Sequence, residues 1–237
     1  MGTLYNPSIV RDGLVLHLDA ANVKSYPGSG STWSDLSGND LHFTMVGTPT
    51  WNSSGYFTGF TTGTYFECNN TTGWSSVMPV GDTSRTVCAL VYLANGSAYN
   101  HIIHWGTGGV SQQDYGLTVS NNALSDHHWA TSNIGNISLV NGTNYFFSTR
   151  YNTATYPGSR FQVNNQFDSQ TDTTSDLSTG TSTLRIGSRT STPTEFWDAG
   201  NTISLISVYN RDLTDSELLQ NYQAYRGGME YDRLDIK

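Results

Sequence analysis

The chain has 237 residues, of which only 13% are charged, and its net charge is −8 at pH 7 with Lys24 and Lys237 as the only lysines. With so few basic residues we expect no positively charged patch that could contact a phosphate backbone, and therefore no nucleic-acid partner. No apolar run reaches the roughly 18 residues of a membrane span, and residues 1–7 lack the pattern of a signal peptide, so we expect neither membrane insertion nor general secretion.

Short strands separated by turn residues fill most of the chain. The first strand is expected at 13–20, an apolar run that Gly13 and Asp19 bound. Residues 22–39 hold Pro27 and three glycines, which is typical of a long surface loop. Further strands are expected at 41–47, 64–68, 85–94, 101–106, 115–121, 127–132, 144–152, 159–165, 183–188 and 201–210. About a dozen strands at this spacing favour an antiparallel sandwich or barrel in one domain.

Only residues 207–228 carry a helix signal. Thr214 is followed three residues later by Glu217, the pattern of a capping box, and Leu213 and Leu218 stand at the positions of a hydrophobic staple. The residues expected to face the sandwich are Leu218, Tyr222 and Tyr225. The pattern predicts a helix of about three turns that ends near Gly227 and must pack against the sheets, because it is too short to be stable alone.

Cys68 and Cys88 are the only cysteines. Both lie in apolar strand-like runs, so we expect two buried free thiols. A disulfide between them is the alternative. Two cysteines cannot form a zinc site by themselves.

Several segments together resemble one family, the laminin-G-like or concanavalin A-like lectin/glucanase sandwiches. They are "GLVLHLDAAN" at 13–22, "WSDLSGND" at 33–40, "TLRIGS" at 183–188 and "ISLISVYNRDLTDSELLQNY" at 203–222. The resemblance implies an all-β, antiparallel jelly-roll sandwich with one short C-terminal helix. It implies a sandwich domain over 13–227, with an N-terminal arm at 1–12 and a C-terminal arm at 228–237.

The opening phrase, with Pro27 and Trp33, is especially similar to domains of tailed-phage virion proteins. This resemblance implies a structural or decoration protein on the virion surface, extracellular after lysis. Its partners would be other virion proteins of the capsid, collar or tail, with host-surface glycans and a homo-oligomer as further expectations. The alternative is a cellular carbohydrate-binding module or lectin from a larger surface protein.

Family relatives that hydrolyse glucans carry a Glu-x-Asp-x-(x)-Glu strand, whose acidic residues flank the scissile bond. None of the four glutamates, Glu67, Glu195, Glu217 and Glu230, opens such a motif. No nucleophile elbow or phosphate-binding loop is present either. We therefore expect a non-enzymatic protein.

Sugar binding needs aromatic faces together with groups that hydrogen-bond to hydroxyls. The candidate carbohydrate-binding residues are Asp114, Tyr115, Asp126, His128 and Trp129. The alternative is that Trp129 is half-buried on a strand and the histidines are merely exposed. His101 and His104 alternate with apolar residues and are interpreted as strand histidines with satisfied hydrogen bonds rather than as ligands.

Laminin-G-like domains often bind calcium through aspartates and backbone carbonyls, and oxygen ligands suit this hard cation. The candidate metal ligands are Asp114, Asp126 and Asp198, which stand beside predicted turns. Solvated loop aspartates are the alternative, because no dense acidic spacing occurs. No cofactor is expected to be required.

Overall fold

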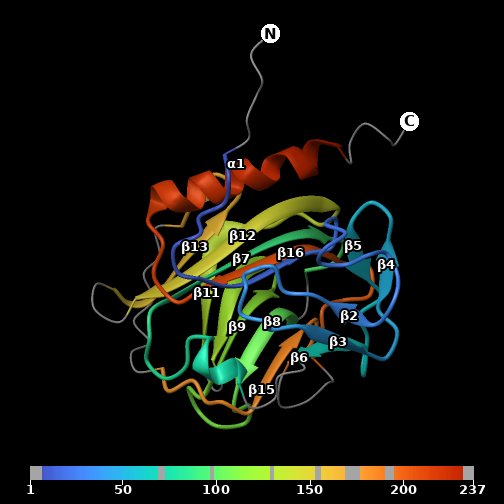
Figure 1. Cartoon of the computed structure of the whole chain (residues 1–237). Helices are drawn as coiled ribbons and strands as arrows, with labels where there is room; N and C mark the ends of the chain where they lie inside the picture. Colours follow the sequence, from blue (N-terminus) through green and yellow to red (C-terminus); the bar gives the residue numbers. More distant parts are fainter. Residues whose placement is uncertain are drawn as a thin grey trace.

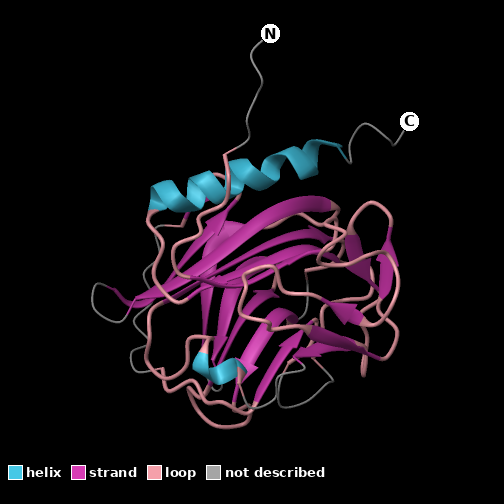
Figure 2. Cartoon of the chain, viewed as in Figure 1, coloured by secondary structure: helices cyan, strands magenta, loops and turns pink. Residues whose placement is uncertain are grey.

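The structure is a computed structural model that describes residues 7–68, 73–96, 99–128, 131–152, 156–168, 177–189 and 195–231, with the backbone alone at 131, 156–158 and 227–231. Two antiparallel sheets lie face to face (Figures 1 and 2). Sheet A has the spatial order β14 (Gln166–Phe167), β13 (Tyr156–Val163), β12 (Thr143–Asn152), β7 (Arg85–Leu93), β16 (Thr202–Tyr209), β5 (Tyr56–Thr58) and β4 (Thr50–Asn52), with β1 (Leu14–Asp19) also paired to β16. The predicted all-β sandwich is confirmed.

Sheet B carries the candidate site described below. Its spatial order is β11 (Thr131–Ser138), β10 (Ala123–His128), β9 (Asp114–Ser120), β8 (Asn100–Gly106), β15 (Thr183–Ile186), β6 (Tyr65–Cys68), β3 (Phe43–Val46) and β2 (Thr32–Trp33). A tight turn joins β9 to β10, because Asn121 and Asn122 adopt φ angles of 51° and 57° that asparagine tolerates well. This turn fixes the register of the two strands that hold most of the site.

Most strands lie where the sequence predicts them. The predicted strand at 127–132 is wrong as a single element, because its residues are divided between the end of β10 and the start of β11. The strands β2, β4, β5 and β14 were not predicted, since runs of two or three residues are too short to show a period of two.

The main core fills the space between the two sheets. Sheet A contributes Val87 and Ile206, and sheet B contributes Trp105 and Leu117, all of them fully buried. Successive strand residues point to opposite faces, so the neighbours of these core residues point out of the sandwich. A second core lies on the outer face of sheet A.

Helix α1 (Asp215–Tyr231) covers this outer face of sheet A (Figure 1). The predicted capping box is confirmed, since Thr214 N donates to Glu217 Oε2 at 2.8 Å and Glu217 N donates to Thr214 Oγ1 at 3.3 Å. Leu213 and Leu218 are both buried in the second core, as the staple predicts. A short 3-10 helix, η1 (Trp74–Ser76), lies elsewhere on the chain.

The helix is longer than predicted and continues past Gly227 to Tyr231. Glycine inside a helix costs only about 1 kcal/mol relative to alanine, so a glycine near a helix end does not have to stop it. Residues 228–231, predicted to belong to the C-terminal arm, are therefore helical.

The described part of the predicted N-terminal arm packs against the sandwich and α1. Val10 is buried in the second core; its N–H donates to Asn221 Oδ1 at 2.9 Å, and Tyr209 Oη donates to its carbonyl at 3.1 Å. Residues 1–6 and 232–237, the outer parts of the two predicted arms, lie outside the described residues.

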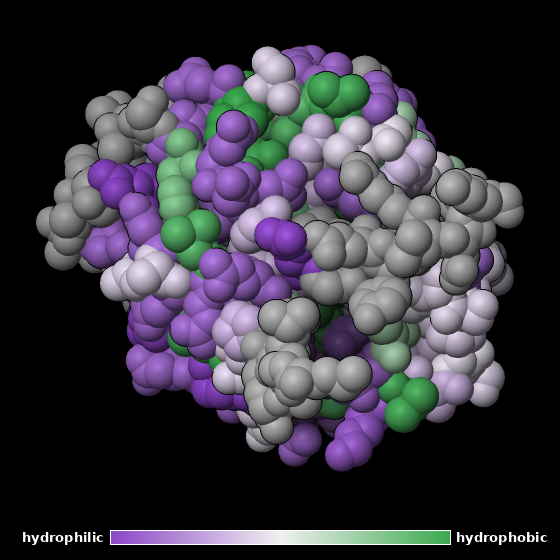
Figure 3. All heavy atoms as spheres, turned by 90° about the horizontal axis from the view of Figure 1, so that it is seen from above, coloured by the Kyte–Doolittle hydropathy of each residue, from purple (hydrophilic) through white to green (hydrophobic). Residues whose placement is uncertain are grey.

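Both cysteines are buried and neither is in a disulfide, as expected for two buried thiols. Burial raises the pKa of the Cys88 thiol to about 12. Within the described residues, no helix has the length and apolar character that crossing a membrane requires. On the face drawn in Figure 3, hydrophilic side chains predominate and hydrophobic ones form separate groups.

Candidate functional site

Two histidines on strands β8 and β10 of sheet B lie on either side of a glycine on the strand between them, β9. His104 on β8 and His127 on β10 both pair with Gly116 of the intervening strand β9. Residues directly opposite one another share a face of the sheet, and the His104 and His127 ring centroids are 5.5 Å apart. Gly116 leaves the space for this arrangement, because a Cβ at that position would lie 2.3 Å from Cδ2 of His104.

A β-bulge brings a third histidine to the same face. The register of β8 against β9 shifts between His101 and Ile103, so His101 opposes Thr118 and His104 opposes Gly116. Without the shift, residues three apart on a strand would point to opposite faces. The His101 ring consequently lies 5.1 Å from the His104 ring and 5.2 Å from the His127 ring, measured between centroids.

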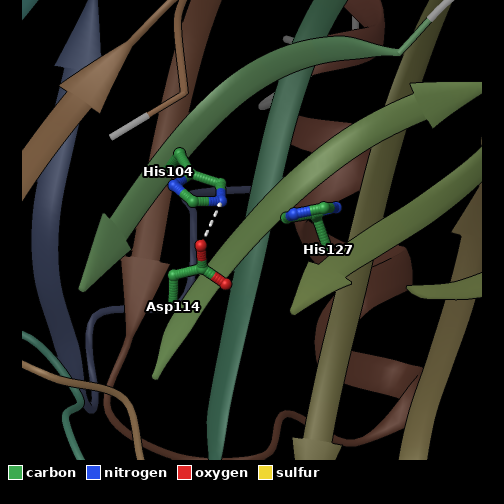
Figure 4. A group of neighbouring side chains, drawn as sticks. All are labelled: His104, Asp114 and His127. Carbon is green, nitrogen blue, oxygen red and sulfur yellow. Dashed lines mark ion pairs between the residues drawn. The ribbon is translucent and has the colours of Figure 1, made fainter. Parts of the chain in front are cut away.

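Asp114 adds a carboxylate to this group. It stands two residues before Gly116 on β9, on the same face, and its Oδ2 lies 3.6 Å from Nε2 of His104. One ligand atom from each of His104, Asp114 and His127 lies within 4.8 Å of the other two. Figure 4 shows the three side chains. We call these three residues the His–Asp cluster.

Two more exposed side chains, Tyr99 and Glu195, lie close to the histidines of this site. Glu195, whose side chain is 37% exposed, lies 3.4 Å from Nε2 of His101 and accepts a 2.5 Å hydrogen bond from Arg189 Nη1. Tyr99 is 48% exposed, and its ring centroid is 6.5 Å from that of His127. We call Tyr99, His127, Arg189 and Glu195 the rim.

Burial keeps the imidazoles of this site neutral. It lowers the pKa of His127 to about 3, with a further contribution from His101, and it lowers the pKa of His104 well below the usual range. The neighbouring His101, together with Arg189, holds the pKa of Glu195 down to about 2. At neutral pH the site therefore presents uncharged imidazoles beside an ionised carboxylate.

Three of the predicted sugar-binding residues, Tyr115, Asp126 and His128, face the interior of the sandwich. Asp126 opposes the core residue Leu117, and its carboxylate accepts a hydrogen bond from the Ser159 hydroxyl of sheet A. The His128 ring stacks on Tyr115 at 5.6 Å, and Tyr115 Oη lies 3.3 Å from Thr149 Oγ1 of sheet A. These residues are fully buried, so their hydroxyl, ring and carboxylate groups serve contacts between the sheets.

The five predicted sugar-binding residues do not form one surface. Asp114 lies on the outer face of sheet B, whereas Tyr115, Asp126 and His128 lie on the inner face. Trp129 lies outside the described residues.

The three predicted metal ligands are not gathered either. Asp198 precedes β16, and its carboxylate accepts hydrogen bonds from Asn95 Nδ2 at 3.1 Å and from Gly200 N at 3.1 Å. Among the described residues, the His–Asp cluster is the group of metal-ligating side chains, and it contains Asp114 but neither Asp126 nor Asp198. Calcium binding by these three aspartates stays a prediction.

His104 and His127 were not among the predicted ligands, although His127 lies in the stretch 125–130 from which sugar-binding candidates were taken. The interpretation of His101 and His104 as ordinary strand histidines ignored that three-residue spacing breaks strand alternation, which is the available signal for a bulge. No sequence pattern pointed to Arg189 and Glu195. Backbone hydrogen bonds outside the regular strands hold them at this site, including the one from Arg189 N to Glu195 O at 2.9 Å.

A separate pocket lies on the other side of the molecule. It has a volume of about 230 Å³ and lies between the outer face of sheet A and α1. Its lining includes Asp19, Asn144 and Tyr225. This pocket is an alternative place for a small ligand.

Solved structures with a similar overall fold include a sialidase, an arabinanase domain and a toxin receptor-binding domain. A Trypanosoma rangeli sialidase in complex with sialic acid matches 95% of this chain with a TM-score of 0.61 and 16% identity. Domain 4 of an extracellular arabinanase from Geobacillus stearothermophilus, in complex with arabinotriose, matches 87% with a TM-score of 0.58 and 13% identity. The receptor-binding domain of botulinum neurotoxin C/D mosaic serotype matches 90% with a TM-score of 0.65 and 13% identity.

The chain spans different shares of these proteins: 34% of the sialidase chain, 52% of the toxin domain and 96% of the arabinanase domain. At such low identities the likeness shows a shared lectin-like β-sandwich fold. No family model matches the sequence, and no curated protein matches it. The structures named here give no link to a phage.

Several matched structures are sialidases, of which this chain spans 33–34% of the length, and they contradict the expectation of a non-enzymatic protein. The expectation depended on the absence of a strand with paired carboxylates. That criterion applies to glucanases, whereas sialidases use a tyrosine nucleophile and fall outside the two-carboxylate rule. The fold is similar to that of these sialidase and arabinanase-domain structures.

Proposed function

We propose that this protein is a carbohydrate-binding β-sandwich whose sugar site is the rim on the outer face of sheet B. The observation that carries the proposal is the composition of the rim. The exposed ring of Tyr99 lies 6.5 Å from the ring of His127, and the half-exposed carboxylate of Glu195 lies 3.4 Å from His101, the neighbour of His127.

This combination suits a sugar. A pyranose or furanose ring has an apolar face that can lie on the Tyr99 ring, and hydroxyls that donate to a carboxylate. Glu195 is ionised at neutral pH and is held by Arg189, so its oxygens are fixed acceptors. Sites of this kind, with one apolar surface and a few placed polar groups, are typical of small-ligand recognition.

Titration calorimetry with two sugars tests the proposal. Sialic acid and arabinotriose are the probes, because proteins of the same fold hold them in solved structures, and a glycan array widens the search. We expect the natural chain to bind at least one glycan, Tyr99→Ala and Glu195→Gln to weaken that binding at least tenfold, and Tyr99→Phe to retain it.

Asn144→Ala is the matched control, because Asn144 lines the separate pocket at sheet A. Loss of binding in Asn144→Ala with full binding in Tyr99→Ala would place the sugar at that pocket and contradict the rim. Absence of binding across the array would contradict the carbohydrate-binding function itself.

Glycoside hydrolysis is the second candidate function, favoured by the sialidase neighbours. Fluorogenic sialoside and arabinofuranoside substrates test it directly. Product release that Tyr99→Ala abolishes would assign catalysis to this face. Absence of release from every substrate, in protein that binds the matching sugar, would contradict it.

We also propose that the protein acts on the surface of a phage virion, among capsid, collar or tail proteins. The support is the resemblance of the opening phrase, with Pro27 and Trp33, to domains of tailed-phage virion proteins. Purified virions that contain the chain, or neighbouring capsid and tail genes, would support this placement. Neighbouring genes for cell-surface proteins would favour the cellular lectin.

A further inference from the structure

We propose that the His–Asp cluster (His104, Asp114 and His127) is a binding site for one divalent first-row transition-metal ion, with zinc as the representative ion. The three side chains come from adjacent strands β8, β9 and β10 and converge on one face of sheet B (Figure 4). This inference goes beyond sugar binding at the rim and does not depend on it.

The geometry is close to that of a bound site. The ligand atoms of the three residues lie within 4.8 Å of one another, and His104 Nε2 and Asp114 Oδ2 are 3.6 Å apart. Ligands about 2 Å from a tetrahedral zinc ion are roughly 3.3 Å apart. Side-chain rotations that shorten the longest of these separations by about 1.5 Å would therefore bring the three ligands around one ion.

His127 supplies a second, independent observation. Its side chain is more than nine-tenths buried, yet Nε2 has no hydrogen-bond partner among the described residues. Its other ring nitrogen, Nδ1, lies 3.1 Å from Ser132 Oγ. A hydrogen bond at one nitrogen of a histidine commonly orients the other toward a metal, so Ser132 is the positioning residue for this ligand.

The donor set favours a transition ion over calcium. Two imidazoles and one carboxylate suit zinc, copper, nickel or ferrous iron, whereas calcium takes six to eight oxygen ligands. The lowered pKa values of His104 and His127 keep both rings in the neutral form that binds metals. His101 borders the cluster, with ring centroids 5.1 Å and 5.2 Å from the two ligand histidines.

Metal titration of the full chain tests the proposal. Protein without an affinity tag is stripped with a chelator and titrated with Zn²⁺ or Ca²⁺ in a calorimeter and with Co²⁺ by visible absorption. We expect one Zn²⁺ per chain, a Co²⁺ spectrum of low coordination number, and weaker binding of Ca²⁺.

Graded variants separate a ligand role from a structural one. His127→Ala and Asp114→Asn should each weaken Zn²⁺ binding by roughly 100-fold, and Ser132→Ala by about tenfold. His42→Ala is the control, because His42 is a half-exposed histidine outside sheet B's His–Asp cluster. Circular dichroism at each step confirms that the variants remain folded, and Asp114→Asn keeps the shape of the side chain if His127→Ala unfolds.

Three results would overturn the proposal. They are failure of the stripped chain to bind Zn²⁺ and Co²⁺, full Zn²⁺ affinity in folded Asp114→Asn or His127→Ala, and loss of the bound ion in His42→Ala alone. Because no sugar is present, none of these results bears on the proposed glycan function.

Discussion

At the scale of single residues, the site depends on one glycine. Gly116 lies between His104 and His127 in the sheet, and a side chain there would meet the His104 ring at 2.3 Å and the Ile103 carbonyl at 3.0 Å. His104 is completely buried, so its ring has little room to move aside. Gly116 therefore keeps the space in which the histidine rings meet.

Gly116→Ala should displace the His104 ring. We expect at least tenfold weaker Zn²⁺ binding and a loss of about 1–3 kcal/mol in the free energy of unfolding, the usual cost of overpacking. Calorimetry and urea unfolding measure the two effects. Gly200→Ala is the control, because its new Cβ would have no neighbour nearer than 3.2 Å; unchanged Zn²⁺ affinity in Gly116→Ala would contradict this account.

At the scale of elements, α1 depends on its capping box. Thr214 and Glu217 satisfy each other's backbone N–H groups, and Arg211 donates to Glu217 Oε1 at 2.6 Å. These contacts lower the pKa of Glu217 to about 2, with Arg211 as the largest cause. The helix start is therefore fixed by residues within seven positions of one another.

Thr214→Ala should lower the free energy of unfolding by about 1 kcal/mol, because it removes the N-cap hydroxyl. Thr214→Ser should restore most of the loss. The exposed Gln223 lies inside the same helix, so Gln223→Ala is the control and should change little. Equal urea midpoints for Thr214→Ala and the natural chain would show that the box does not stabilise α1.

Asn221 joins three elements that are far apart in the sequence. It is fully buried, accepts from Val10 N at 2.9 Å and donates to Tyr209 Oη at 3.1 Å. It thereby holds the N-terminal segment and β16 against α1.

Asn221→Ala should lower the free energy of unfolding by about 1–3 kcal/mol, because it leaves a buried Val10 N–H without its acceptor. Limited proteolysis should also cut the N-terminal segment faster. Gln220→Ala removes one exposed bond, from Gln220 Nε2 to Ser8 O at 2.6 Å, and should have a smaller effect. The reverse order of the two variants would contradict the role given to Asn221.

Local signals in the sequence were enough to predict elements but not the site. The apolar run at 13–20, the strand at 85–94 and the capping box each depend on neighbouring residues, and the structure places all three as predicted. Alternation could show that Asp114 and Tyr115 point to opposite faces. It could not show that Asp126 shares the face of Tyr115, because that depends on the register of β9 against β10.

At the scale of the whole molecule, buried histidines make stability depend on pH. Burial lowers the pKa of His17, on the outer face of sheet A, to about 4; Arg11 lowers it further and Asp35 opposes the shift. His17 Nδ1 lies 3.0 Å from Ser207 Oγ, and its ring stacks on Tyr225 of α1 at 6.4 Å. The unfolded chain binds this proton near pH 6.5, so stability is lost as the pH falls from about 6.5 toward 4.

Because of His17, the free energy of unfolding should be about 2 kcal/mol lower at pH 5 than at pH 7.5. His17→Gln should lose correspondingly less over the same range, since glutamine does not titrate. Urea unfolding at the two pH values, with a chelator present, measures the difference. The other histidines are present in both proteins, so a pH dependence that His17→Gln leaves unchanged would contradict the assignment.

Sugar binding at the outer face of sheet B can be mapped residue by residue with NMR. A ¹H–¹⁵N spectrum of the labelled chain is recorded during titration with the tightest-binding glycan found. The account predicts progressive shifts at the backbone amides of Tyr99, His127, Arg189 and Glu195, with Asp19, Asn144 and Tyr225 unmoved. Shifts confined to these last three residues would place binding at the sheet A pocket and contradict the account.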